Sequence, residues 1–284
     1  MTRALYSRVI GYGTLGCALC PHMCEIGLGQ SGLCSARRNE NYVLCAESYG
    51  RVTSLALDPI EKKPLRCFHP GAMILSAGSY GCNMRCAFCQ NHEISTGRAP
   101  SRKMMPDELA ALSLEYADKG SIGVAYTYNE PLVGYEFVLD CAKLVRAQGQ
   151  KNVLVTNGLI NEQPLRGLLP LVDALNIDLK CFSESYYMEL GGDLETVKSS
   201  IEMAAEACHV EVTTLIVPGK NDSPGEMAAL SSWLAGVDPN IPLHLSRFFP
   251  RHNMTDAEPT PAGTLRALEG EARKHLSRVY LGNV

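Results

Sequence analysis

The sequence has no excess of positive charge, no long apolar run and no internal repeat, and each absence excludes a class of protein. Its 284 residues contain 26 lysines and arginines against 30 aspartates and glutamates, so no basic surface favours nucleic acid as a partner. No run of about 18 apolar residues occurs, which excludes a membrane-spanning helix. Charged residues make up 20% and hydrophobic residues 46%, values typical of globular chains, which exclude disorder, collagen and coiled coil.

The first 24 residues also lack the continuous apolar segment of a secretion signal. Residues 9–24 carry no charged side chain, but three glycines and Pro21 interrupt them. The sequence Thr-Leu-Gly-Cys17 resembles a lipoprotein processing site only faintly. We therefore expect a cytoplasmic protein with no membrane partner.

What is present, and unusual, is a set of 12 cysteines. Dense disulfides belong to small secreted domains, and this chain is long enough to bury a core without them. Seven of the cysteines form two groups with mostly short gaps, which favours metal binding in a reducing compartment. The first group is Cys17, Cys20, Cys24 and Cys34, and the second is Cys82, Cys86 and Cys89. The other five are scattered, and isolated cysteines are mostly small buried hydrophobic residues.

From residue 73 onward, short β-rich runs alternate with helical stretches. Strands are expected at 73–77, 122–127, 152–156, 174–179, 210–217 and 243–246, at intervals of about 20–35 residues that suit successive βα units. A helix is expected from Pro106, and a second from Pro131 to Gly149 with Cys141 on its apolar face. The predicted fold class is α/β, a full or partial parallel barrel whose chemistry lies at the C-terminal strand ends.

Residues 1–72 differ and are expected to form a small cysteine-rich subdomain. The β-like runs 42–46 and 51–57 flank Tyr49-Gly50 and predict a hairpin. The four thiols of the first group are enough to close a metal site, either a structural zinc or a fully ligated iron–sulfur cluster, with His22 as a spare ligand. Disulfides or free thiols are the remaining alternatives. A metal would help such a small segment to fold.

The second group presents three thiols within eight residues, Cys82-Asn-Met-Arg-Cys86-Ala-Phe-Cys89. Three cysteines can hold three corners of a four-iron cluster, and no fourth cysteine lies nearby. An iron without a protein ligand is open to bind another molecule, as catalytic metals are. The alternative is a structural zinc with a distant fourth ligand such as His92.

The spacing Cys-x3-Cys-x2-Cys, with Phe88 before the last cysteine, resembles the signature of radical S-adenosylmethionine (SAM) enzymes. The stretch from Gly81 to Asn91 is similar to the pyruvate formate-lyase activating enzymes. From residue 14 to the end, the chain resembles the radical enzyme of the AmmeMemoRadiSam gene system, including the segment Asp58-Pro-Ile-Glu-Lys-Lys-Pro-Leu65. The resemblance implies a partial (β/α)6 TIM-like barrel over residues 73–284, and a [4Fe-4S] cluster whose open iron binds SAM.

The resemblance also implies SAM contacts at successive strand ends. Phe88 and Val217 would border the adenine, and Glu130 would receive the methionine amino group. The other implied contacts are Tyr128, Asn129, Thr156, Asn157, Asp178, Lys180 and His244. Tyr128 and Asn129 replace the two glycines of the family's Gly-Gly-Glu segment. Several have plainer roles: a helix N-terminus for Glu130, a turn for Asn157, an internal ion pair for Asp178 with Lys180, and a core position for His244.

The activity that the resemblance implies is reductive cleavage of SAM. One electron from a donor such as flavodoxin or ferredoxin would enter the cluster, and the product 5′-deoxyadenosyl radical would remove hydrogen from a substrate that the sequence does not identify. One alternative is an activating enzyme that makes a glycyl radical on a partner protein. The other is a non-catalytic iron–sulfur or zinc scaffold for the partner proteins of its gene system.

Overall fold

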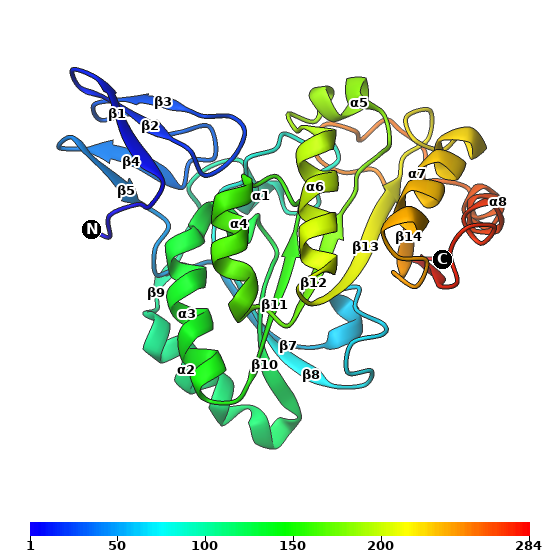
Figure 1. Ribbon diagram of the computed structural model, residues 1–284, viewed down its shortest axis with the longest axis horizontal. Coiled ribbons are helices and arrows are strands. Elements are labelled where there is room, and N and C mark those ends of the chain that lie inside the picture. Colours follow the sequence, from blue (N-terminus) through cyan, green and yellow to red (C-terminus); the bar gives the residue numbers. More distant parts are fainter.

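The computed structural model describes residues 1–284, and an eight-stranded sheet lies at its centre (Figure 1). The strand order is β15-β14-β13-β12-β11-β10-β8-β7, and only β7 is antiparallel to its neighbour. The strands are β7 (Ser54–Pro59), β8 (Met73–Gly78), β10 (Ser121–Tyr126), β11 (Lys151–Thr156), β12 (Ala174–Asp178), β13 (His209–Ile216), β14 (Leu243–Arg247) and β15 (Val279–Gly282). The six strands expected from the sequence are present, and the prediction of a mostly parallel α/β fold is confirmed.

Helices follow most of the parallel strands and bury their apolar faces. They are α2 (Pro106–Glu115), α3 (Tyr135–Ala147), α4 (Glu162–Leu168), α6 (Leu194–Ala205), α7 (Pro224–Val237) and α8 (Ala262–Ala272), with short helices α1 (His92–Ser95) and α5 (Glu184–Glu189). Because the strands are covered, they read as nearly continuous apolar runs, as β8 does. The helix expected from Pro131 begins as a 3-10 turn and continues as α3, with Cys141 fully buried as predicted.

The N-terminal residues form two small antiparallel sheets beside the main one, at the upper left of Figure 1. The first contains β1 (Ser7–Gly11), β2 (Thr14–Cys17) and β3 (Glu25–Gly27), and the second contains β4 (Arg37–Glu40) and β5 (Val43–Ala46). Farther along, β6 (Arg51–Val52) pairs with β9 (Arg102–Lys103).

The predicted hairpin of residues 42–46 with 51–57 is wrong. Strand β5 pairs instead with β4 across Asn41 and Tyr42, which both have positive φ, 50° and 62°. Positive φ at both central residues is typical of the type I′ turn, whose twist matches that of a hairpin. Residues 54–59 then pair with β8, so the predicted boundary at residue 72 lies between two strands of one sheet.

A buried carboxylate, Glu211, ties the start of β13 and β14 to the chain ahead of β8. It accepts hydrogen bonds from the backbone N–H groups of Arg66 (3.0 Å) and Cys67 (2.7 Å). Its other partners are the Nε2 atoms of His209 (2.9 Å) and His244 (2.6 Å). Although burial opposes the charge, these hydrogen bonds lower the pKa of Glu211 to about 2.

This shift predicts an acid-sensitive contribution to stability. The pKa of an unfolded glutamate is about 4.3, so the contribution is complete above that pH and is lost as the pH falls toward 2. We expect it to reach about 3 kcal/mol in the free energy of unfolding. Urea denaturation of the wild type and of Glu211→Gln at pH 6 and pH 3 tests this, because other carboxylates titrate in both proteins. Equal loss of stability in the two proteins between these pH values would contradict it.

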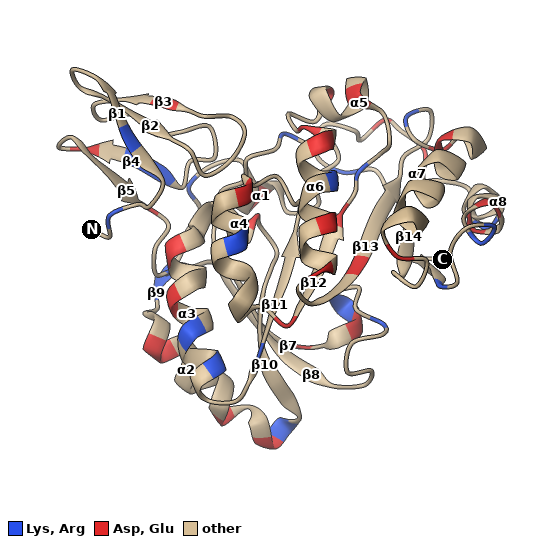
Figure 2. Cartoon of the chain, in the orientation of Figure 1, with Lys and Arg blue, Asp and Glu red and all other residues tan.

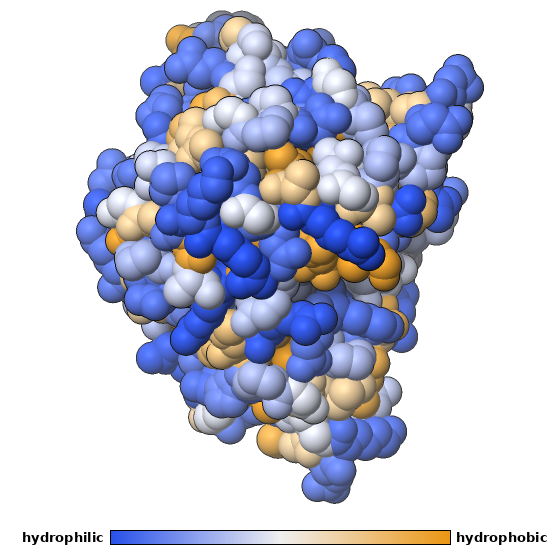
Figure 3. Space-filling view, turned by 90° about the vertical axis from the view of Figure 1, so that its right-hand side faces the viewer, coloured by the Kyte–Doolittle hydropathy of each residue, from blue (hydrophilic) through white to orange (hydrophobic).

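No helix in the structure has the length and hydrophobicity needed to cross a membrane. Acidic and basic residues are interspersed along α3, α4 and α6 (Figure 2), and the face beyond α7 and α8 carries small apolar patches separated by polar side chains (Figure 3).

Candidate functional site

A cavity of about 450 Å³ opens at the C-terminal ends of the parallel strands, where the sequence analysis placed the chemistry. All three cysteines of the second group line it. Among the other predicted site residues, those that line it are Phe88, Tyr128, Asn129, Glu130, Thr156, Asn157, Asp178 and Lys180. Because the ends of parallel strands meet at one edge of the sheet, residues nearly 100 positions apart in the chain share one space.

The three cysteines lie on the loop between β8 and α1. Cys82 Sγ is near two N–H donors, the backbone N of Met84 (3.4 Å) and Nδ2 of Asn157 (3.6 Å). Burial raises the pKa of the Cys82 thiol, as does the Glu130 carboxylate, and burial raises the pKa of Cys86 to about 11. Such thiols ionise at neutral pH when a metal centre supplies positive charge.

These features fit an iron–sulfur cluster better than a single zinc ion. No group of three or more His, Cys, Asp or Glu side chains in the structure is arranged to hold one metal ion. The suggested fourth zinc ligand, His92, does not line the cavity: it stacks on His252 at 4.4 Å. Three thiols spread along one wall of a roomy cavity, with N–H donors near a sulfur, match the environment of a cluster.

Glu130 follows β10, and its carboxylate is buried and fully engaged. Oε1 accepts hydrogen bonds from Leu132 N (2.9 Å) and Thr156 Oγ1 (2.7 Å), and Oε2 accepts one from Asn157 N (2.7 Å). Burial raises the pKa of Glu130 to about 7, and these hydrogen bonds oppose the rise. Glu130 therefore begins a 3-10 helix, which is its plainer role, and also joins β10 to the end of β11 at the cavity wall.

Tyr128, expected from the resemblance to replace a glycine, has a φ of 74°, a left-handed conformation that favours glycine. A non-glycine residue with this backbone conformation costs about 1–3 kcal/mol. Two contacts offset the cost: Tyr128 Oη donates to Asp58 Oδ2 at 2.8 Å, and Lys63 Nζ lies 4.7 Å from the ring centroid. Gly78 provides the space, since a Cβ there would lie 2.8 Å from Tyr128 Cδ2.

Two lysines of the cavity wall were not assigned a role by the sequence analysis. Lys62 and Lys63 line the cavity and both pair with Asp58, at 3.1 and 2.8 Å. The sequence feature that could have identified these lysines was the segment Asp58–Leu65, which is part of the family resemblance. The pairing of β7 with β8 brings the two lysines to the site.

Two asparagines hold the start of the cysteine loop. Asn129 Oδ1 accepts from Ser79 N (2.9 Å), while its Nδ2 donates to the carbonyl oxygen of Gly81 (3.0 Å). Asn157 Nδ2 donates to Asn83 Oδ1 (2.9 Å). Both predicted residues therefore position the loop in addition to lining the cavity.

Asp178 ends β12 and Lys180 follows it, and the two form an ion pair of 2.7 Å at the cavity wall. Burial opposes the charge of Lys180, but the neighbouring Asp178 and Cys86 hold its pKa above the usual range. The alternative role expected from the sequence, an internal ion pair, describes their contact. Lys180 also places a cationic group beside Cys86.

Two predicted contacts, Val217 and His244, do not line the cavity. Val217 is fully buried, and His244 is bound to Glu211 and stacks on Tyr280, with ring centroids 5.3 Å apart. His244 lies near the start of β14, whereas the cavity is at the strand end, where Ser246 lines it. His244 therefore has the alternative role expected from the sequence, that of a core histidine whose hydrogen bond is satisfied.

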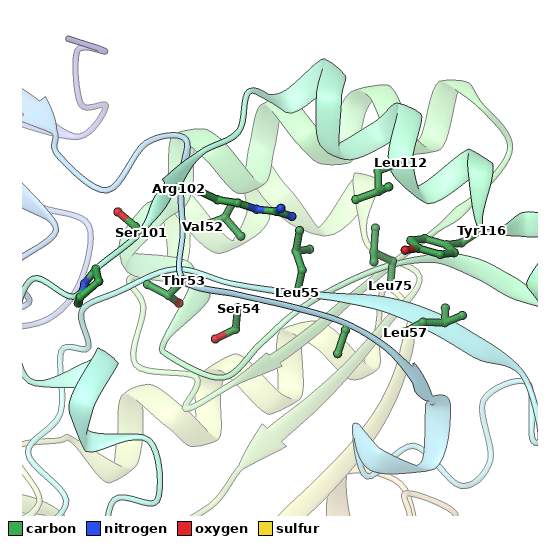
Figure 4. Close-up of a pocket in the computed structure, with 12 residues that line it drawn as sticks. Val52, Thr53, Ser54, Leu55, Leu57, Leu75, Ser101, Arg102, Leu112 and Tyr116 are labelled. Carbon is green, nitrogen blue, oxygen red and sulfur yellow. The ribbon is translucent and has the colours of Figure 1, made fainter.

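A larger cavity, about 680 Å³, lies along the edge strand β7 (Figure 4). Its walls include Leu55, Leu57, Leu75, Arg102 and Tyr116. No cysteine, histidine or carboxylate lines it. The groups able to carry redox chemistry are therefore at the smaller cavity.

Comparisons with known proteins agree with this geometry. The sequence model of the Radical SAM superfamily matches residues 77–231, more than half of the chain. An uncharacterized protein of Methanocaldococcus jannaschii is 39% identical over 100% of this chain and 86% of its own length. A pyruvate formate-lyase-activating enzyme of Staphylococcus epidermidis is 24% identical over 56% of this chain and 67% of its own. A solved radical SAM methyltransferase from Sphaerobacter thermophilus shares the fold, with a TM-score of 0.57 at 14% identity, over 75% of this chain and 67% of that one. The three cysteines lie within the matched residues, at the strand ends of a parallel sheet, in agreement with these comparisons. The chain belongs to the Radical SAM superfamily.

Proposed function

We propose that this chain is an enzyme that holds a [4Fe-4S] cluster on Cys82, Cys86 and Cys89 and binds SAM in the adjoining cavity. Family membership implies both cofactors. When bound and reduced, they would supply a 5′-deoxyadenosyl radical that abstracts hydrogen from a substrate still to be identified. The observation that carries the proposal is one cavity lined by three thiols together with a buried carboxylate and a buried ammonium, on Glu130 and Lys180.

The residues of the cavity have distinct tasks in this proposal. Glu130 and Lys180 carry opposite charges that suit the amino and carboxylate groups of the methionine part of SAM. Phe88, nearly buried at 7% exposure, offers an apolar surface for the adenine. Asn157 donates toward Cys82 and steadies the loop through Asn83. The strand ends hold these groups in place before any ligand arrives.

The role of Glu130 leads to a prediction for SAM binding. Glu130→Gln keeps the shape but removes the negative charge and turns one acceptor into a donor, so we expect the Kd for SAM to rise about tenfold to a hundredfold. Glu162→Gln is the matched control, because it makes the same change at an exposed carboxylate that does not line the cavity. Equilibrium binding of SAM to the reconstituted proteins measures both. An equal Kd in the wild type and in Glu130→Gln would contradict the role of Glu130.

The proposed electron source is a low-potential one-electron donor such as flavodoxin or ferredoxin, since radical SAM enzymes generally need a reductant. Protein partners from the AmmeMemoRadiSam gene system are part of the same proposal. We further propose that the four N-terminal cysteines bind a metal, whose nature is argued below.

Anaerobic reconstitution with iron and sulfide tests the function directly. With dithionite and SAM, the enzyme should release 5′-deoxyadenosine and methionine, whereas a non-catalytic scaffold should release neither. The similarity to pyruvate formate-lyase-activating enzymes favours a second candidate, activation of a glycyl radical enzyme. An activating enzyme should leave an oxygen-cleavable glycyl radical on its partner protein, and an enzyme acting on small molecules should not.

A further inference from the structure

The four cysteines of the first group line a second, enclosed cavity. Successive segments of the N-terminal region bring them there: Cys17 ends β2, Cys20 and Cys24 flank the turn before β3, and Cys34 precedes β4. Apart from the four thiols, most of the wall is apolar. The polar groups of that wall are His22, Arg37 and Asn83.

A zinc ion draws four sulfurs to about 2.3 Å from its centre. The four thiols line one cavity but do not converge as ligands of a single ion. A four-iron cluster, which holds its cysteines apart, suits this spacing.

A buried arginine offers the cavity a hydrogen-bond donor that has no partner. Arg37 is 1% exposed and lines the cavity, with Nη1 3.9 Å from Cys17 Sγ and Nη2 paired with Glu136 at 2.6 Å. Its Nε–H has no hydrogen-bond partner in the structure. Buried donors without partners are costly, so the cavity favours an occupant whose sulfur atoms accept from this group.

Asn83 is shared by the two cysteine sites. It lines the N-terminal cavity together with the four cysteines and directly follows Cys82 in the chain. Its Oδ1 accepts from Asn157 Nδ2, which also points at Cys82 Sγ. Asn83 therefore lies between the N-terminal cavity and the loop of Cys82.

The two loops are also in direct backbone contact. A Cβ added at Gly81 would lie 2.4 Å from the carbonyl oxygen of Cys34, a distance that only glycine permits. Arg85 Nη2 donates to the carbonyl oxygen of Leu33. The loops of Cys34 and Cys82 thus pack backbone to backbone.

We propose that Cys17, Cys20, Cys24 and Cys34 hold a second [4Fe-4S] cluster that passes electrons to the cluster on Cys82, Cys86 and Cys89. A low-potential one-electron donor reduces the N-terminal cluster by one electron. That electron moves across the shared wall at Asn83, which reoxidises the N-terminal cluster and reduces the second cluster. The relay rests on the proposed function, whereas the presence of the N-terminal cluster does not.

A variant with Cys82, Cys86 and Cys89 all changed to alanine tests the cluster without any SAM chemistry. After reconstitution with iron, sulfide and zinc all present, it should retain about four iron atoms and give the electron paramagnetic resonance signal of a reduced [4Fe-4S] cluster. One zinc with no iron, or no metal at all, would overturn the cluster. Because this measurement needs no SAM, a negative result would contradict the N-terminal cluster without contradicting the proposed function.

Magnetic relaxation in the wild-type protein tests the relay and requires no change in the N-terminal cysteines. The N-terminal signal should saturate at higher microwave power in the wild type than in the triple alanine variant, because a second reduced cluster lies close by. Asn83→Leu should slow reduction of the second cluster by a protein donor while both clusters remain loaded. Identical saturation in the wild type and the triple variant would overturn the relay.

Discussion

Replacing Cys82 with alanine should reduce the formation of 5′-deoxyadenosine from SAM to the uncatalysed background and should remove about four iron atoms from the reconstituted protein. Its sulfur lies beside two N–H donors and lines the cavity with Cys86 and Cys89. With one of only three protein ligands gone, the cluster no longer has its anchor. Anaerobic turnover with dithionite, read by chromatography, and iron and sulfide counts on the same sample measure both effects.

The matched control is Cys208→Ala, the same substitution at a cysteine that lines neither cysteine cavity and whose Sγ contacts the carbonyl oxygen of Ala204. Its iron content and SAM cleavage should equal those of the wild type. Metal on the N-terminal cysteines should also persist in Cys82→Ala. Continued cleavage of SAM by Cys82→Ala would refute the assignment of the reactive cluster.

Lys63→Met should lower the free energy of unfolding by about 3–5 kcal/mol, the largest stability effect that we expect from a charged residue. Lys63 is 3% exposed, and its Nζ is 2.8 Å from Asp58, which is buried as well. Burial opposes the charge of Asp58, but hydrogen bonds from Lys63 and Tyr128 hold its pKa well below the usual range. Removing Lys63 would leave Asp58 as a buried carboxylate without its main partner. Urea denaturation at pH 7 measures the loss.

Lys62→Met supplies a control at the neighbouring position. Lys62 pairs with the same Asp58 at 3.1 Å, but its side chain is 66% exposed, so we expect a loss of no more than about 1 kcal/mol. Adding Asp58→Asn to Lys63→Met should recover part of the stability, because no buried charge remains. Equal losses in the two lysine variants would show that burial does not decide the strength of this pair.

Much of the fold could be predicted because its signals are local. Each of the six strands predicted from the sequence is a largely apolar run, and Pro106 and Pro131 mark where helical segments begin. The seventh parallel strand, β15, was not predicted. The hairpin was mispredicted because its turn depends on positive φ at Asn41 and Tyr42, a conformation that asparagine adopts readily but tyrosine rarely does. Strand β7 was placed in the wrong sheet because its partner is not its neighbour in the hairpin but β8, across a turn-rich connector.

The candidate site, like the fold, could be predicted only in part. Most of the predicted residues follow strands directly, and parallel pairing brings strand ends to one edge, so their order in the chain was enough to place them in one cavity. Val217 and His244 were expected at the cavity but do not line it: Val217 is fully buried just beyond the end of β13, and His244 lies two residues before the cavity-lining Ser246 of β14. The position of Lys62 and Lys63 at the cavity wall depends on an antiparallel pairing of β7 that no local pattern marks.

The sequence by itself determined which residues form the candidate cluster site, because three cysteines within eight residues restrict the ligand set whatever the surroundings are. Only the tertiary structure decided what surrounds those thiols. Burial and long-range hydrogen bonds determine that Glu130 is held by three donors and that Tyr128 reaches Asp58. Tertiary packing also placed the two cysteine groups against each other, since the contact of Gly81 with Cys34 joins loops that are 47 residues apart in the chain.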